Sequence, residues 1–159
     1  MTGIAVSSGK PAVVILSEAA ASLGRRIAGD IDGELHGAAS RGVVGITDFE
    51  FESSHRTWPD RVAAGLGGLR VRTGFYEDAL TEVLDSGLRT GDPLADLVTL
   101  GPLKIISDGS LGTLTANCCD PYVAGSPHPR GKRNISQDHL VELLATASAA
   151  GLDVALHAI

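Results

Sequence analysis

Four short apolar runs along the chain have the composition of buried β-strands. They are rich in aliphatic and β-branched residues, and glycine or polar residues bound them. The predicted strands cover residues 42–49, 69–76, 103–108 and 152–157. The third run leads directly into a Gly-rich turn at 108–112, and a turn at the end of a buried strand is where we expect chemistry.

Segments with helical spacing separate these runs. We predict helices over 17–27, 31–40, 59–64 and 78–86, with glycines interrupting the second one and a polar loop over 50–57. The best-defined helix follows Ser136, whose hydroxyl can cap it, and ends at Gly151. Residues 113–133 contain prolines, glycines and both cysteines, so we predict a long loop there that could cover a pocket.

The alternation of strands and helices predicts an α/β fold built from right-handed βαβ units with a parallel sheet. Four strands are about half of an eight-stranded barrel, whose usual length is roughly 250 residues. The periodicity alone also fits an open flavodoxin-like sheet. At 159 residues, 43% of them hydrophobic, the chain is long enough for one domain with a core.

Charge and hydropathy exclude several classes of partner. The net charge is −6 and no basic cluster is present, so we expect no nucleic-acid partner. The apolar runs are far shorter than the roughly 20 residues that cross a bilayer, so we expect no membrane segment and a cytoplasmic location. The two cysteines, Cys118 and Cys119, are adjacent, which predicts reduced, inert thiols.

Two segments carry a resemblance to a known family. The string GPLKIISDGSLGTLTA, residues 101–116, resembles the fourth-strand signature of the amidohydrolase superfamily, in its amidohydrolase 3 branch. The string GLDVALHAI, residues 151–159, resembles the fifth strand of that branch, and the two predicted strands before them look like strands two and three. The resemblance covers residues 38–159, whereas residues 1–37 stay unassigned.

This resemblance implies a partial (β/α)8 TIM barrel, with parallel strands and outer helices, that belongs to a metal-dependent hydrolase of amide or cyclic amide C–N bonds. Lys104 matches a strand-four lysine that is often carboxylated, and His157 matches a strand-five histidine ligand. Asp108, at the end of the fourth strand, is a candidate catalytic residue. A bound divalent metal, zinc in the complete enzyme, lowers the pKa of its water to about 7 and polarises the scissile carbonyl.

The chain also departs from the family pattern. It has no His-x-His motif, and its five histidines are scattered. Leu114 stands where the branch usually has an arginine. The chain therefore supplies two of about six expected ligands, and it could bind no metal by itself.

Outside the resemblance, ordinary structural interpretations compete with the functional ones. Lys104 could be a lysine at the edge of the sheet, and His157 could be a buried histidine of the core. The Asp-Gly-Ser sequence at 108–110 could be an ordinary turn in which the aspartate side chain accepts a hydrogen bond from its own backbone. For Asp48 the turn-forming role is favoured over an active-site role.

Three functions remain open. The chain could be a piece of a metal-dependent amidohydrolase acting on a small-molecule amide. It could instead be a non-catalytic truncated remnant that forms homo-oligomers through open barrel edges at 42–49 and 154–156. A small-molecule-binding or phosphate-binding α/β module ranks last, because the turn at 108–112 lacks both Gly-rich phosphate-binding motifs.

Overall fold

The structure is a computed structural model that describes residues 4–5, 13–15, 31–123 and 127–159. The predicted helix over 17–27 lies outside these residues. The chain forms two compact units, Met1–Pro102 and Leu103–Ile159. The boundary between the two units falls inside a strand, whereas the sequence analysis began its barrel domain at residue 38. That domain assignment stays a prediction.

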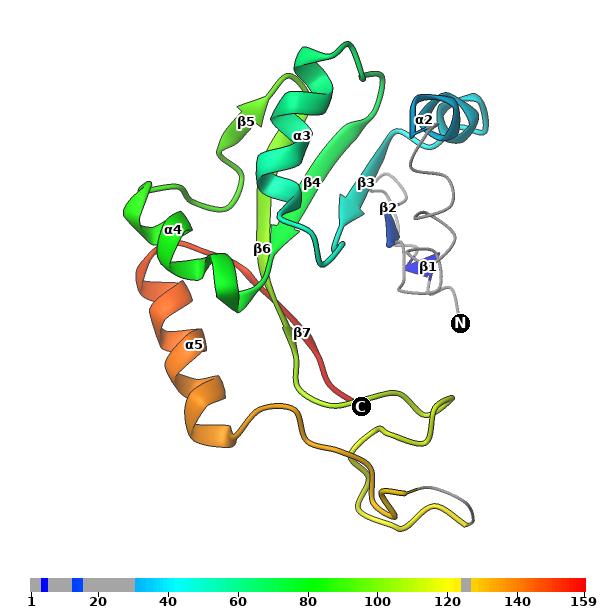
Figure 1. The fold of residues 1–159 in the computed structure, drawn as a ribbon, viewed down its shortest axis with the longest axis vertical. Helices are drawn as coiled ribbons and strands as arrows, with labels where there is room; N and C mark the ends of the chain where they lie inside the picture. Colours follow the sequence, from blue (N-terminus) through cyan, green and yellow to red (C-terminus); the bar gives the residue numbers. More distant parts are fainter. Residues whose placement is uncertain (1–3, 6–12, 16–30, 124–126) are drawn as a thin grey trace. The chain divides into compact units, whose positions relative to one another are not determined.

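The first unit contains a mixed β-sheet (Figure 1). Its strands lie in the order β1-β2-β3-β4-β6-β5. Strands β2 and β3 pair in parallel, as do β3 and β4, whereas β1 with β2 and β5 with β6 are antiparallel. Their bounds are Ile4–Ala5 (β1), Val13–Ile15 (β2), Gly45–Asp48 (β3), Arg70–Phe75 (β4), Pro93–Ala95 (β5) and Val98–Ile106 (β6).

Two predictions about the strands were wrong. The third predicted strand was placed at 103–108, but β6 begins at Val98 because it forms an antiparallel hairpin with β5, which the sequence analysis missed. Residues 42–49 were expected to form an open edge. They contain β3, whose two sides pair with β2 and β4, so no edge is open there.

Helices follow β2, β3 and β4. Helix α2 (Ile31–Ser40) confirms the prediction for 31–40, and it continues through both of its glycines. Helix α3 (Ser54–Ala63) begins inside the predicted polar loop, and Pro59 lies within it instead of starting it. A 3-10 turn, η1 (Glu77–Ala79), leads into α4 (Leu80–Asp85).

Burial against the sheet explains the early start of α3. The Trp58 side chain is 4% exposed and packs in a core with Leu69, Val71 and Val98. Its indole N–H donates a 2.6 Å hydrogen bond to the buried carboxylate of Asp48 at the end of β3. The gain from burying this ring offsets the backbone hydrogen bond that Pro59 cannot donate.

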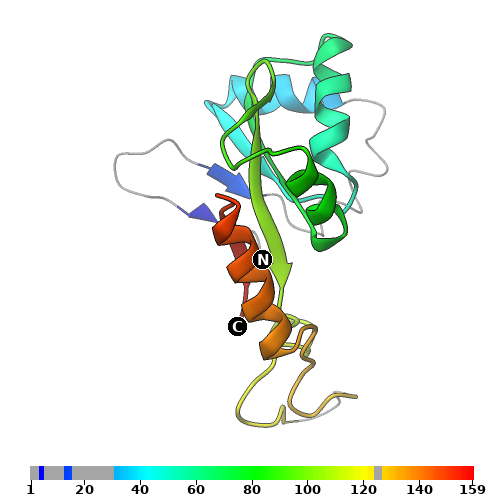
Figure 2. The same cartoon turned by 90° about the vertical axis from the view of Figure 1, so that its left-hand side faces the viewer.

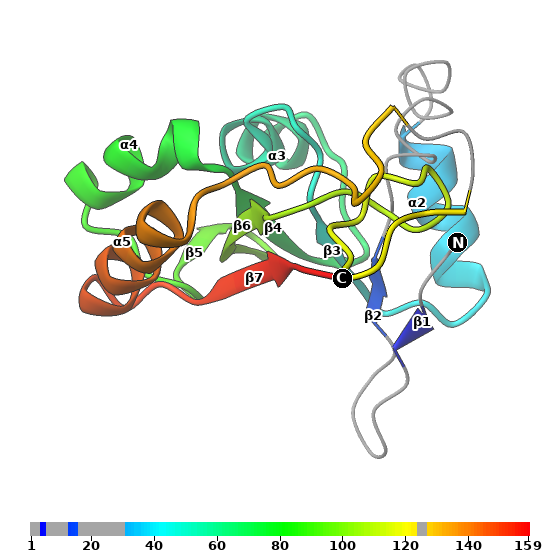
Figure 3. The same ribbon diagram turned by 90° about the horizontal axis from the view of Figure 1, so that it is seen from below.

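The second unit consists of the last part of β6, a long loop, α5 (Gln137–Ala149) and β7 (Val154–His157). Strand β7 pairs in parallel with β6, from Leu103 opposite Val154 to Ile106 opposite His157. Helix α5 runs alongside this part of β6 (Figure 2) and buries Leu143 and Ala147. A turn with Gly151 at φ 71° connects α5 to β7 (Figure 3).

The fold class is thus α/β with parallel strands, as predicted, and the closed eight-stranded barrel stays a prediction. The helix after Ser136, the loop over the described part of 113–133 and the last strand are confirmed. None of the helices that the structure describes is long and apolar enough to span a membrane.

We expect Ser136→Ala to destabilise α5 by about 1 kcal/mol. The Ser136 hydroxyl accepts the N–H of His139 at 3.2 Å, and alanine leaves this N–H of the first turn without its cap. Urea unfolding followed by far-UV circular dichroism measures the change. Ser136→Asp should retain the stability, because aspartate caps equally well; equal losses in both variants would contradict the capping role.

Candidate functional site

Lys104 and His157 lie on the two neighbouring parallel strands of the second unit. Lys104 is paired with Ala155, and Ile106 with His157. Because side chains alternate along a strand and paired residues of parallel strands point the same way, Lys104 and His157 face one side of the sheet. Lys104 precedes the end of β6 by two residues, about 7 Å along the strand. The predicted pairing of their strands is confirmed, whereas the role of both residues as ligands stays a prediction.

Lys104 is half-buried. Burial disfavours its charged form and lowers the pKa of its ammonium from the usual value. A lower pKa increases the fraction of neutral amine, which is the form that reacts with carbon dioxide to give a carbamate.

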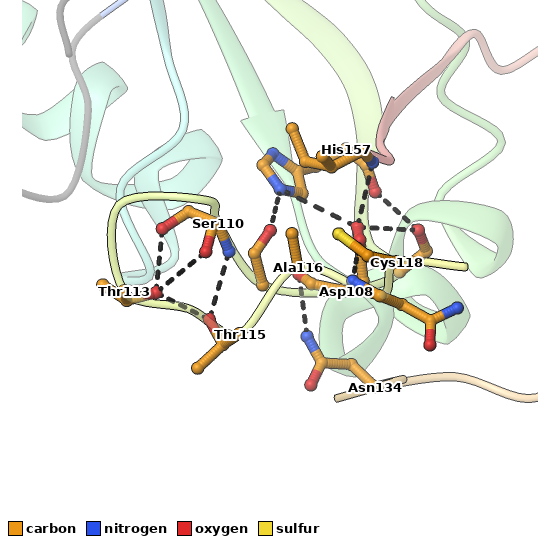
Figure 4. A network of polar contacts seen from close by, with 12 residues as sticks. Asp108, Ser110, Thr113, Thr115, Ala116, Cys118, Asn134 and His157 are labelled. Atoms are coloured by element: carbon orange, nitrogen blue, oxygen red, sulfur yellow. Dashed lines mark hydrogen bonds and ion pairs between the residues drawn. The ribbon is translucent and has the colours of Figure 1, made fainter. Parts of the chain in front are cut away.

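A hydrogen bond to the turn after β6 fixes the His157 ring (Figure 4). Its Nε2 lies 2.8 Å from the carbonyl oxygen of Gly109. Since a carbonyl can only accept, Nε2 carries the hydrogen, and in the neutral ring the lone pair is on Nδ1. Nδ1 is thus the atom of His157 that could bind a metal. Nε2 is also 3.9 Å from Asp108 Oδ1, too far for a hydrogen bond.

Asp108 holds the loops around it together. Its side chain is buried, and its two carboxylate oxygens accept the backbone N–H of Asn117 at 2.8 Å and of Ile159 at 3.2 Å. Its carbonyl oxygen accepts the side-chain amide of Asn134 at 3.1 Å. These contacts give Asp108 a positioning role that joins three segments of the second unit, and its catalytic role stays a prediction.

The turn after Asp108 contains a cluster of hydroxyls that sequence reasoning missed. The Thr113 hydroxyl lies 2.9 Å from that of Ser110 and 2.6 Å from that of Thr115 (Figure 4). The three side chains come together because the chain reverses over 110–115, with Leu114 in the left-handed region at φ 56°. The Ser-x-x-Thr-x-Thr spacing inside a Gly-rich turn was the signal available in the sequence.

Asp48 has a structural role, which is the role that the sequence analysis favoured. One of its oxygens accepts the Trp58 indole N–H, and the other accepts the N–H of Glu50 at 2.9 Å. Asp48 thus forms a local turn and anchors α3 to the end of β3.

The two cysteines form no disulfide; Cys118 is half-buried and Cys119 is exposed. Cys118 Sγ lies 3.5 Å from the Tyr122 hydroxyl, which itself donates to the carbonyl of Ala116. The Cys118 contact is the main cause that raises the pKa of Tyr122 to about 12. The inertness of these thiols stays a prediction.

The second unit contains some, but not all, of the side chains that a divalent metal site needs. Among the described residues no group of three or more His, Cys, Asp and Glu side chains is placed to hold a metal ion. His157 Nδ1 and a carbamylated Lys104 are donors of the right chemistry on one face of the sheet. A cavity of about 280 Å³ in the same unit includes neither of them; its lining includes Ser107, Asn117, Arg133, Ile135 and Leu140.

Comparisons with known proteins agree with this fold. A crystal structure of an uncharacterized metal-dependent hydrolase from Pyrococcus furiosus matches with a TM-score of 0.70 and 25% identity, over 81% of this chain and 27% of that chain. A second one, from Pyrococcus horikoshii OT3, matches with a TM-score of 0.69 and 25% identity, over 81% and 26%. The chain has the fold of part of a metal-dependent hydrolase.

In sequence, the chain is 29% identical over 133 residues to Protein LONG AFTER FAR-RED 3 of Arabidopsis thaliana. This match covers 77% of this chain and 23% of the plant protein. No family model matches the chain. The chain spans about a quarter of the length of the proteins it matches.

Proposed function

We propose that this chain is part of a metal-dependent amidohydrolase that cleaves C–N bonds of small-molecule amides or cyclic amides, with Lys104 and His157 among its metal ligands. The observation that supports the proposal most is their placement on one face of two parallel strands, in a chain with the fold of part of a metal-dependent hydrolase. The divalent metal, zinc in this proposal, would activate water for attack on the amide carbonyl.

Lys104 would act as a ligand after carbamylation. Its neutral amine attacks the carbon of carbon dioxide, an N–C bond forms, one C=O bond pair moves to oxygen, and the nitrogen loses a proton to solvent. Partial burial favours the first step because it lowers the pKa of Lys104. The product is an anion whose oxygens can bind a metal.

His157 would supply the second donor. The Gly109 carbonyl accepts from Nε2 and thereby fixes both the tautomer and the ring orientation, as outer hydrogen-bond partners of metal-bound histidines do. Asp108 supports this arrangement because its contacts position the turn that contains Gly109.

A non-catalytic role is the second candidate. The absence of a three-residue ligand group among the described residues favours it, because two ligands hold a metal weakly and position it poorly for catalysis. Homo-oligomers through the edge of β7 belong to the same hypothesis and stay a prediction.

We expect ¹³C-bicarbonate with zinc to give a carbamate carbon signal in the NMR spectrum of the 159-residue chain. The signal should disappear in Lys104→Met and persist in Lys132→Met, a matched control at an exposed lysine. Zinc binding, measured by calorimetry, should weaken in Lys104→Met and in His157→Gln but not in His139→Gln. The chain alone should hydrolyse no amide, because it supplies only part of the ligand set.

Two outcomes would contradict the proposal. Zinc binding that none of these substitutions changes would remove Lys104 and His157 from the metal site. Zinc-dependent amide hydrolysis that is equal in wild type and in Lys104→Met would show that another group performs the chemistry.

A further inference from the structure

The His55 side chain of α3 is buried in the first unit without a hydrogen-bond partner. It is 6% exposed, and none of the described residues forms a hydrogen bond with either ring nitrogen. The ring packs against Phe75, a buried residue at the end of β4, with the ring centroids 6.3 Å apart and the planes at 65°. The first turn of α3 therefore rests on the end of β4 through a polar ring that water does not reach.

The ionisable side chains near the ring come from α3, η1, α4 and the loop segments beside them. They are Glu52, Arg56, Tyr76, Asp78 and Glu82. The carboxylate of Glu82 lies beside the ring, but its Oε1 is 3.7 Å from Nε2 of His55, which is beyond hydrogen-bond distance. Both oxygens of this carboxylate are bound by the guanidinium of Arg56, Oε1 at 2.8 Å. The acid that could stabilise a charged His55 ring is thus already paired with Arg56.

These surroundings favour the neutral ring. Burial is the main cause that lowers the pKa of His55, the positive charge of Arg56 lowers it further, and Asp78 acts in the opposite direction. Because the folded chain binds this proton less readily than the unfolded chain, the stability is greatest above the usual histidine pKa of about 6.5. It decreases as the pH falls below that value, and the decrease ends below the lower pKa of the folded chain.

We propose that His55 is a pH-sensitive switch that releases the first turn of α3 from the end of β4 when its ring takes up a proton. An imidazolium has two N–H donors, and the buried position offers an acceptor to neither of them. A charged group without a partner is costly to bury, so the protonated ring turns out to solvent. The ring then no longer packs against Phe75, and the turn that carries it loses its support on the sheet. The switch lies within the first unit and does not depend on the hydrolase proposal.

The first test is a pH series of urea unfolding, followed by the fluorescence of Trp58, the single tryptophan, which also lies in α3. Lowering the pH from about 7.5 to about 5.5 should raise the unfolding equilibrium constant of the first unit at least about threefold. The upper limit is about tenfold, which is the limit for one proton whose pKa in the unfolded chain is near 6.5. The first unit contains two histidines, His36 and His55, and histidine is the side chain whose usual pKa lies in this range.

An NMR titration of the folded 159-residue chain locates the change. The His55 ring signals should titrate with a midpoint below about pH 6.5. The amides of Arg56 and Thr57 both donate to the carbonyl of Ser53 in the first turn of α3, at 2.8 and 3.2 Å, and their signals should shift with the same midpoint. The amide of Val71 in β4, which donates to the carbonyl of Leu97, should not shift.

Two substitutions and a control assign the effect to His55. His55→Gln should remove most of the pH dependence of unfolding, because glutamine stays neutral. His36→Gln, at an exposed histidine of α2 in the same unit, should retain it. If His55→Gln does not fold, Arg56→Gln takes its place. It removes the neighbouring positive charge and leaves Glu82 able to accept from the ring, so the pKa of His55 should rise and the pH dependence should shrink.

Three results would overturn the inference. A His55 midpoint at or above about pH 6.5 would mean that the fold does not favour the neutral ring. Amide signals of Arg56 and Thr57 that do not follow the ring would mean that the proton is taken up in place, with no release of the turn. Equal pH dependence in wild type and in His55→Gln would mean that other groups cause it.

Discussion

Asp108→Ala should destabilise the second unit by about 3 kcal/mol. The substitution removes the acceptor of two backbone N–H groups, those of Asn117 and Ile159, and hydrogen bonds to a charged partner contribute roughly 1.5–3 kcal/mol each. Because Asp108 is 3% exposed, water cannot readily take the place of its carboxylate as the acceptor of these two N–H groups. The turn that presents Gly109 to His157 should loosen with it.

Hydrogen exchange of the α5 and β7 amides measures this effect in the second unit. Fluorescence of Trp58, the single tryptophan, reports on the first unit, so the two readouts separate local from global changes. Asp120→Ala is the matched control, at an exposed aspartate of the neighbouring loop, and should change stability by less than about 0.5 kcal/mol. Similar losses in both variants would show that Asp108 anchors nothing.

Gly101→Ala should destabilise the first unit by about 3 kcal/mol. A Cβ at Gly101 would lie 2.8 Å from the backbone carbon of Thr73 and 2.9 Å from the nitrogen of Gly74. Both are main-chain atoms of β4, which cannot move aside without separating β4 from β6. Overpacking of this kind typically costs 1–3 kcal/mol, and more where the backbone must shift.

Unfolding in urea followed by Trp58 fluorescence measures the loss. Gly37→Ala is the control, and its effect should have the opposite sign. A Cβ at Gly37 meets nothing within 4 Å, and the residue lies in the helix α2. It should stabilise the unit by roughly 0.5–1 kcal/mol. A Gly101→Ala chain as stable as wild type would mean that β4 and β6 are not held as closely as the structure shows.

Local signals predicted several elements well. Helix α5 was found from the Ser136 cap, the apolar spacing and Gly151, and each of these acts within one or two turns of chain. Strands β4 and β7 were found from short apolar runs. Helix α3 was placed too late, because the burial of Trp58 against the sheet outweighs the usual position of proline at a helix start.

The candidate site was predictable only in its residue types. The sequence by itself placed Lys104 within one apolar run, Asp108 and His157 at the ends of two such runs, and a Gly-rich turn after the first of them. The tertiary structure decided the register of β6 and β7 and the contacts of Asp108 with residues 117, 134 and 159. It also decided that both ring nitrogens of the His55 side chain are buried without a hydrogen-bond partner. These contacts join residues far apart in the chain, and local periodicity and spacing do not specify such distances.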